Sequence, residues 1–418
     1  MEIERPQEQL GNSKEGAHSK RSWAPSSLPP DVKASPAKTL LWQYFVTVSS
    51  RQFKCWEGSK AMGFDDPLGS LLLAMATFNG PLRSAALAFS ATEYARAQPS
   101  RSPLQSTASL YQKALRMLTS TRGSFPLDAH SLLPPIAASL LLFRVEGVDQ
   151  ASSVRLLALA RSAASCAQSL DREGRQNDSR WSILMALLKW TDICTVNSLF
   201  SQGPSVVEAC VRFPFYEEET MNFSNEFRDW IIHPIYTFSR YLISPLLRIG
   251  RLVQLRKQGA GWSPEMETEA EALEELLLQS YDRDVEASKS RPAEDPDQVL
   301  RVNEAMHAAT SVMYYTRVRD VPFTATFIRR SVARVQQEAA AVDCDSLSSR
   351  ALVFPLFVAG CEAVDEGVRG SITRRILASK RYPELQAPKI VDHLRRIWAI
   401  RDAEPGLSWL AWSVKGLC

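Results

Sequence analysis

The sequence predicts an all-α protein, with a large multi-helix body of about 12–15 helices and a disordered N-terminal segment. Three observations support this prediction. Apolar residues recur every three to four positions over most of the chain, which is the spacing of one helix face. A capping side chain followed by proline, as in Ser263-Pro264, repeatedly marks a helix start. Alternating strand patterns joined by Asn-Gly turns are missing from the sequence.

The first 37 residues are predicted to be disordered. Ser, Pro, Lys, Glu and Gly dominate this segment and leave few apolar side chains to form a core. Helical periodicity begins after it and is largely maintained to the end of the chain. We therefore divide the chain into a disordered segment, residues 1–37, and one helical domain, residues 38–418.

The helices of this domain follow from periodicity and breaks, taken in order along the chain. Asp66-Pro67 begins one helix, and Asn79-Gly80-Pro81 separates it from the next. Met266, Ala270 and Leu273 begin the apolar stripe of a later helix whose opposite face carries glutamates. The predicted helices span residues 38–56, 67–78, 82–97, 103–120, 128–145, 151–170, 179–200, 225–257, 264–288, 296–317, 322–341, 349–378, 389–401 and 407–417.

The composition argues against several classes of protein. The chain is 45% hydrophobic and 23% charged, as in ordinary soluble proteins, and its net charge of +3 is too small to attract nucleic acid to the chain as a whole. Its most apolar stretches, 131–143 and 230–252, are either too short or interrupted by prolines and charges. A membrane span needs about 20 mostly apolar residues. We therefore expect a soluble protein without a membrane partner.

No catalytic, cofactor or metal site is predicted. The seven cysteines are widely spaced and the five histidines are isolated, so neither set has the spacing of a zinc site. Residues 259–261 lack the preceding strand and the third glycine of a dinucleotide-binding loop. Residues 58–63 resemble a phosphate-binding loop, but Phe64 replaces its lysine. Since no nucleophile, base and orienting group can be assembled, we predict that the protein is not an enzyme.

Basic pairs recur late in the chain, at positions 329–330, 374–375, 380–381 and 395–396. The helical pattern favours solvated helix faces for these pairs. A phosphate-contacting surface or a nuclear import signal is the alternative. The best candidate for an import signal consists of Arg374, Arg375, Lys380 and Arg381.

The stretch FPLFVAGCEA, residues 354–363, is apolar on nearly all sides of a helix, which predicts a helix inside the protein. Its small residues would let a neighbouring helix approach closely. Charge begins at Glu362 and dominates by Asp365-Glu366, where we expect the helix to emerge toward solvent. We interpret this stretch as a structural signature and not as a reactive site; its marker residues are Pro355, Ala359, Gly360, Cys361 and Glu362.

The same stretch, followed by Arg369, Ile372 and Leu377, resembles the C-terminal signature of the fungal-specific transcription factor domain. This domain is the regulatory domain of fungal zinc binuclear cluster transcription factors. The resemblance spans about residues 40–415, although Asp66-Pro67-Leu68 replaces the Asn-Pro-aromatic that the family prefers. Other segments that resemble the domain, in the same order, are Tyr44–Phe53, FDDPLGSLLLAMATFNGPLRSAALAFSATEYA (64–95), Tyr111–Leu115 and Leu140–Glu146.

The resemblance implies a nuclear fungal transcriptional regulator that acts through a helical regulatory domain, with control of a metabolic, secondary-metabolite gene cluster as its expected role. The family's DNA reader, six cysteines within about thirty residues, has no counterpart, and residues 1–37 contain no cysteine. We therefore expect a protein partner or a homodimer, and DNA contact only indirectly or through a zinc-cluster exon missing from the gene model. A small-molecule effector is a further expected partner.

Two alternatives stay open at the level of the sequence. The chain can be a ligand-responsive or scaffolding helical protein with no direct role in transcription. It can also be an enzyme on a helical fold, since catalytic groups can converge from distant positions.

Overall fold

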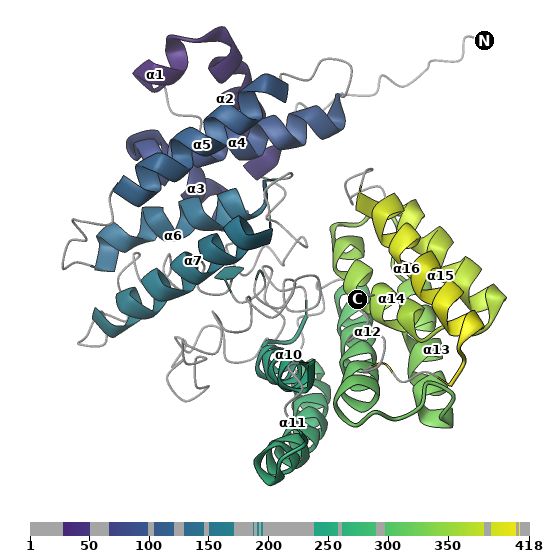
Figure 1. Ribbon diagram of the computed structural model, residues 1–418. Coiled ribbons are helices and arrows are strands. Elements are labelled where there is room, and N and C mark those ends of the chain that lie inside the picture. Colours follow the sequence, from purple (N-terminus) through teal and green to yellow (C-terminus); the bar gives the residue numbers. More distant parts are fainter. Residues whose placement is uncertain are drawn as a thin grey trace, which may run out of the picture.

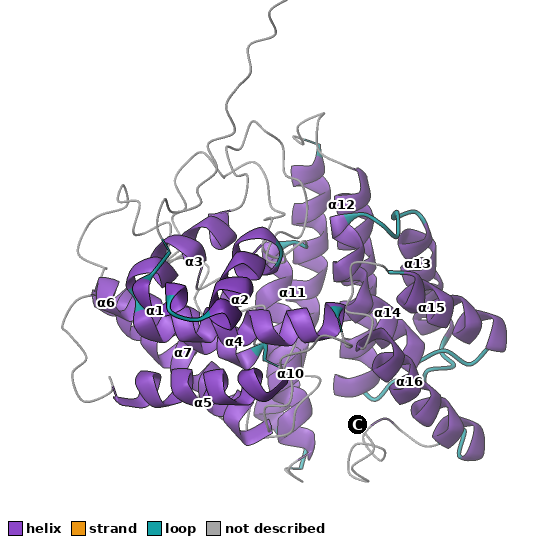
Figure 2. Cartoon of the chain, turned by 90° about the horizontal axis from the view of Figure 1, so that it is seen from above, coloured by secondary structure: helices purple, strands orange, loops and turns teal. Residues whose placement is uncertain are grey.

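The computed structural model describes residues 28–50, 67–98, 104–120, 129–145, 150–170, 187, 190, 191, 194, 238–257, 261–289, 297–379, 386–406 and 409. These residues contain fourteen α-helices and no β-strand (Figures 1 and 2). The predicted all-α fold is therefore confirmed.

Helices from the first part of the chain lie together in one half of the molecule (Figure 1). Helix α4 is central to this half, because it packs against α2, α3, α5 and α6. Ala85, Ala88 and Ala91 of this helix are fully buried, and their small side chains let four neighbouring helices pack closely around it. The helices of this half are α1 (Pro30–Lys33), α2 (Pro36–Thr47), α3 (Pro67–Phe78), α4 (Gly80–Ala97), α5 (Leu104–Ser120), α6 (Ala129–Phe143) and α7 (Gln150–Leu170).

The second half is built around α14, which packs against α12, α13, α15 and α16. This is the position that a helix apolar on nearly all sides requires. The α-helices of this half are α10 (Ile243–Lys257), α11 (Pro264–Ser288), α12 (Asp297–Met313), α13 (Thr326–Ala340), α14 (Val353–Cys361), α15 (Glu366–Ala378) and α16 (Gln386–Ala403). Its shorter helical segments are the 3₁₀ helices η7 (Arg240–Leu242) and η9 (Leu347–Leu352) and the π-helix η8 (Tyr314–Val318).

Buried apolar residues of both halves form one connected core. The apolar stripe predicted on α11 is part of it, since Met266, Ala270, Leu273 and Leu277 are all buried. Ser263 caps this helix as predicted by accepting a hydrogen bond from the backbone of Met266. Among the described helices, none combines the length and the apolar character needed to cross a membrane.

The predicted disorder of residues 1–37 is wrong for its last ten residues. These residues contain α1 and the start of α2, which Ser35 caps. Val32 is fully buried in the core, and Asp31 forms an ion pair of 2.9 Å with Arg83 of α4. The only large apolar residues of these ten are Leu28 and Val32, too few to give a periodic signal, so the sequence does not reveal this docking.

The helix predicted over residues 349–378 is interrupted. The 3₁₀ turn η9 precedes α14, and α14 ends at Cys361. Asp365 then begins α15 by accepting a hydrogen bond from the backbone of Val368 at 3.1 Å. Because an aspartate at this position stabilises a helix start, it favours a break over a continuous helix.

Two further predicted boundaries differ widely from those of the structure. The helix expected at 38–56 ends at Thr47, and the one expected at 225–257 begins only at Ile243 within the described residues. The helices expected at 179–200 and 407–417 lie largely outside the described residues.

Candidate functional site in the second half of the fold

The signature helix α14 is enclosed by its neighbours. Leu394 of α16 lies so close that a Cβ on Gly360 would stand 2.9 and 3.0 Å from its two methyl carbons. The indole of Trp398 donates a hydrogen bond of 2.8 Å to the carbonyl oxygen of Gly360. Glycine at this position therefore gives α16 room to approach. The buried residues of α14 are Val353, Pro355, Leu356, Val358, Ala359, Gly360 and Cys361.

The chain is exposed at Asp365 and Glu366, where it was expected to reach solvent, whereas Glu362 is still buried. The Glu362 side chain is only 1% exposed and forms an ion pair with Arg401 of α16, whose side chain is 4% exposed. The Arg401 guanidinium carbon also lies 4.1 Å from the centroid of the Phe323 ring. A buried carboxylate needs a charged partner to offset its lost hydration, and this partner comes from another helix. The ion pair therefore fixes α16 against the end of α14.

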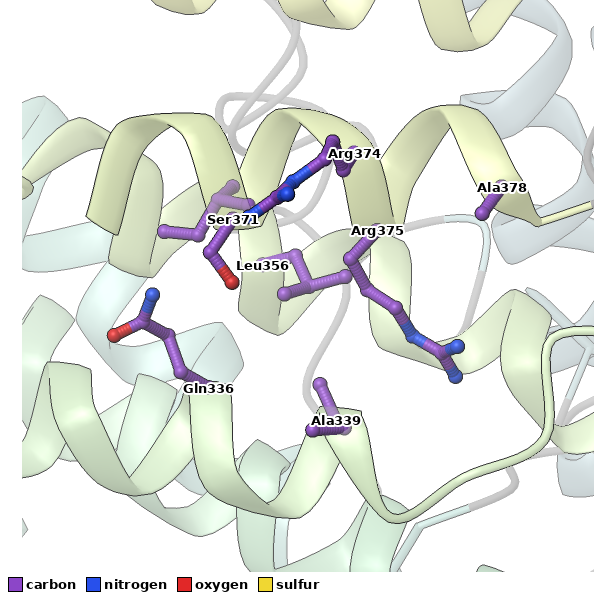
Figure 3. A pocket seen from close by; sticks show the side chains of 9 residues that line it. Gln336, Ala339, Leu356, Ser371, Arg374, Arg375 and Ala378 are labelled. Carbon is purple, nitrogen blue, oxygen red and sulfur yellow. The ribbon is translucent and has the colours of Figure 1, made fainter. Parts of the chain in front are cut away.

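A cavity of about 290 Å³ lies beside α14, between this helix, α13 and α15 (Figure 3). Its apolar lining comes from the side chains of Leu356 and Ile372 and from the small side chains of three alanines. Leu356 lies between Arg375 on one side and the Gln336–Ser371 pair on the other (Figure 3). The lining residues are Gln336, Ala339, Ala340, Leu356, Ser371, Ile372, Arg374, Arg375 and Ala378.

The two arginines of the cavity differ in their surroundings. Arg375 donates hydrogen bonds to the carbonyl oxygen of Val342 and to the Cys344 thiol, which hold its guanidinium in place. Arg374 is exposed, and no ion pair joins it to a carboxylate of the described residues. Both guanidinium groups are permanently charged. The cavity therefore combines an apolar lining with two positive charges.

Only two of the four candidate nuclear import residues lie in the described part of the chain. Arg374 and Arg375 lie on α15, and Arg375 is bound to the 342–344 segment. Lys380 and Arg381 lie outside the described residues. The import signal stays a prediction.

The comparison with known families covers most of the chain. The model of the family described as "Fungal specific transcription factor domain" matches residues 39–415. The chain belongs to this family. No curated protein matches the chain, and no solved structure does. The matched region of this fungal transcriptional regulator includes α3 to α16, and with them the cavity and the Glu362–Arg401 pair.

The regulator also contains a buried polar cluster that sequence reasoning missed. One Asp284 carboxylate oxygen accepts hydrogen bonds from Asn303 at 2.8 Å and contacts His307 Nε2 at 2.5 Å. The other accepts a hydrogen bond of 2.7 Å from the Ser239 hydroxyl. The backbone of Ser239 in turn donates to Asn303 at 2.7 Å. The cluster joins the segment before α10 to α11 and α12.

His307 is isolated in the sequence, because its acidic partner lies 23 positions away. One weak signal was present: Asp284 continues the apolar stripe of α11, seven positions after Leu277, where a polar side chain needs a buried partner. Within the described residues, no group of three or more His, Cys, Asp or Glu side chains could hold a metal ion.

Proposed function

We propose that this fungal transcriptional regulator acts in the nucleus through protein contacts made by its helical domain, either with a second copy or with another protein. The observation that supports the proposal is the family match over residues 39–415. DNA is then contacted by the partner, or by a zinc cluster encoded outside these 418 residues. Within the sequence given, the two closest cysteines are Cys194 and Cys210, too far apart for such a cluster.

A tethering experiment tests regulation without requiring a DNA site. The full chain is fused to an unrelated DNA-binding domain in a fungal host that carries the matching reporter gene. We expect reporter transcription to rise or to fall relative to the DNA-binding domain alone. An unchanged reporter, with the fusion protein present in the nucleus, would contradict the proposal.

Nuclear import is tested with a fluorescent fusion of the full chain. We propose that the basic residues around position 380 direct it to the nucleus. Replacing both Lys380 and Arg381 with alanine should shift the fluorescence toward the cytoplasm, while the same change at Arg329 and Arg330 of α13 should not. Arg375 is left intact because it binds the 342–344 segment. Equal nuclear signal in both variants would refute this import signal.

We further propose that the regulated genes form a metabolic gene cluster, of the kind that makes a secondary metabolite. The support is the resemblance of the domain to regulators of the zinc-cluster class. Transcript levels measured after deletion of the gene should change together for a contiguous set of metabolic genes. Scattered changes, or none, would argue against cluster control.

A second candidate function is that of a ligand-responsive or scaffolding helical protein with no direct role in transcription. The cavity beside α14 favours this alternative, because a hollow with apolar lining and a few polar groups is typical of small-molecule sites. Ligand binding together with an unchanged reporter in the tethering experiment would favour it over the first proposal.

A further inference from the structure

We propose that the cavity between α13, α14 and α15 binds a small amphipathic organic anion, meaning a carboxylate on a short apolar body. The proposal concerns binding by the protein itself, so it does not depend on where the chain acts or on how it reaches DNA.

The size and lining of the cavity define the apolar part of the ligand. Its volume of about 290 Å³ lies just below the usual range for ligand sites, about 300–1,000 Å³, so the ligand must be small. Leu356 and Ile372 offer apolar surface, and the alanines at 339, 340 and 378 leave space that larger side chains would fill. A short alkyl or aromatic body fits this space and is stabilised by leaving water.

The charges define the other part of the ligand. Arg374 and Arg375 line the cavity, and none of the described residues that line it carries a carboxylate. An anion is therefore attracted and a cation is repelled. A guanidinium group is planar and suits a carboxylate better than a point charge does, because it can donate two parallel hydrogen bonds.

Arg375 is prepared for this role by the contacts that hold it. Its guanidinium group uses one N–H for the Val342 carbonyl oxygen and one for the Cys344 thiol, out of five N–H donors. The remaining donors are available to a ligand, and a fixed side chain loses little entropy on binding. Gln336 and Ser371, on the other side of Leu356, provide neutral hydrogen-bonding groups for a second polar atom (Figure 3).

Octanoate and octanamide are a matched pair of probes with the same shape and different charge. Their dissociation constants are measured by calorimetry on the purified full chain. We expect octanoate to bind about tenfold or more tightly than octanamide, because a charge-assisted hydrogen bond is stronger than a neutral one. Octanoate should also raise the melting temperature, since a ligand that binds only the folded state stabilises it.

Two variants locate the binding. Arg374→Gln should weaken octanoate about fivefold to tenfold and leave octanamide unchanged, while Arg330→Gln, an exposed arginine of α13 outside the cavity, should change neither. Ala378→Leu should weaken both probes by filling the cavity. Its control is Ala403→Leu, because Ala378 and Ala403 are both exposed and both end their helices.

The proposal is overturned if octanoate and octanamide bind equally, or if neither binds at millimolar concentration. It is also overturned if the matched controls weaken octanoate as much as the cavity variants do. The comparison of the two probes on the unchanged protein decides the anion preference even if a variant fails to fold.

Discussion

Gly360 is the residue at which the packing of α16 on α14 is most easily tested. Replacing it with leucine should lower the free energy of unfolding by about 1–3 kcal/mol, because the Leu394 methyl groups already occupy the space of a Cβ. The better helix propensity of leucine opposes this loss by up to about 1 kcal/mol. Urea denaturation measures the difference.

Gly370 provides the matched control. It lies inside α15, and nothing stands within 4 Å of a Cβ built on it. Gly370→Leu should therefore leave stability unchanged or raise it by up to about 1 kcal/mol. If the two variants were equally stable, close contact at Gly360 would not explain the glycine.

Glu362 is the second residue whose replacement should strongly lower the free energy of unfolding. Glu362→Gln removes the charge that faces Arg401 and should destabilise the fold by about 3–5 kcal/mol, because the arginine then stays buried without its carboxylate. Replacing both partners, Glu362→Leu with Arg401→Met, should recover much of this loss.

An exposed pair on α16, the helix that carries Arg401, gives the comparison for Glu362. Asp392 and Arg395 form an ion pair of 3.0 Å with both side chains more than half exposed. Asp392→Asn should cost less than about 1 kcal/mol, since water screens and solvates exposed charges. A similar loss at both sites in urea denaturation would show that burial does not set the strength of the Glu362 pair.

His393 of α16 links stability to pH. Burial, and secondarily the positive charge of Arg396, lower the pKa of His393 in the folded state. The unfolded chain, with a histidine pKa of about 6.5, then binds more protons than the folded protein. This residue therefore makes the protein less stable as the pH falls below about 6.5.

Replacing His393 with glutamine should make the free energy of unfolding less dependent on pH between about 5 and 7.5. Urea denaturation of both proteins at several pH values measures this dependence. An identical pH profile for variant and wild type would rule out a contribution from His393.

At the scale of elements, α1 is a short helix that ties the N-terminal segment to the core. Deleting residues 1–34 should destabilise the protein by about 1.5–3 kcal/mol, the value of one buried aliphatic side chain, because Val32 and the Asp31–Arg83 pair are lost. Deleting residues 1–27 removes none of these contacts and should leave the melting temperature nearly unchanged. Thermal unfolding of the two truncated proteins distinguishes docking of α1 from a dispensable segment.

At the scale of the whole molecule, the prediction concerns binding of zinc and DNA. We expect these 418 residues alone to bind no zinc and to show no sequence-specific affinity for DNA, since the cysteines are dispersed and the net charge is +3. Metal analysis and gel-shift competition on purified protein provide the measurement. A discrete complex that survives unrelated competitor DNA at physiological salt would mean that the helical body itself reads DNA.

The sequence by itself determined the features that depend on local pattern. The helical class, the buried stripe that begins at Met266 on α11, and the interior position of α14 follow from apolar spacing, because burial repeats with the period of the helix. Family membership likewise followed from an ordered set of short segments, and the match over residues 39–415 confirms it. The interruption at Asp365 was missed because a helix cap competes with an otherwise continuous pattern.

Tertiary structure alone decided which distant residues meet. Glu362 pairs with Arg401 across 39 positions, and Asp284 pairs with His307 across 23. The local sequence around one partner does not indicate where the other lies. The cavity needs α13, α14 and α15 at once, so no single segment predicts it. The physical reason is that charge pairing and empty volume are set by how helices pack, whereas periodicity specifies only which face of each helix is buried.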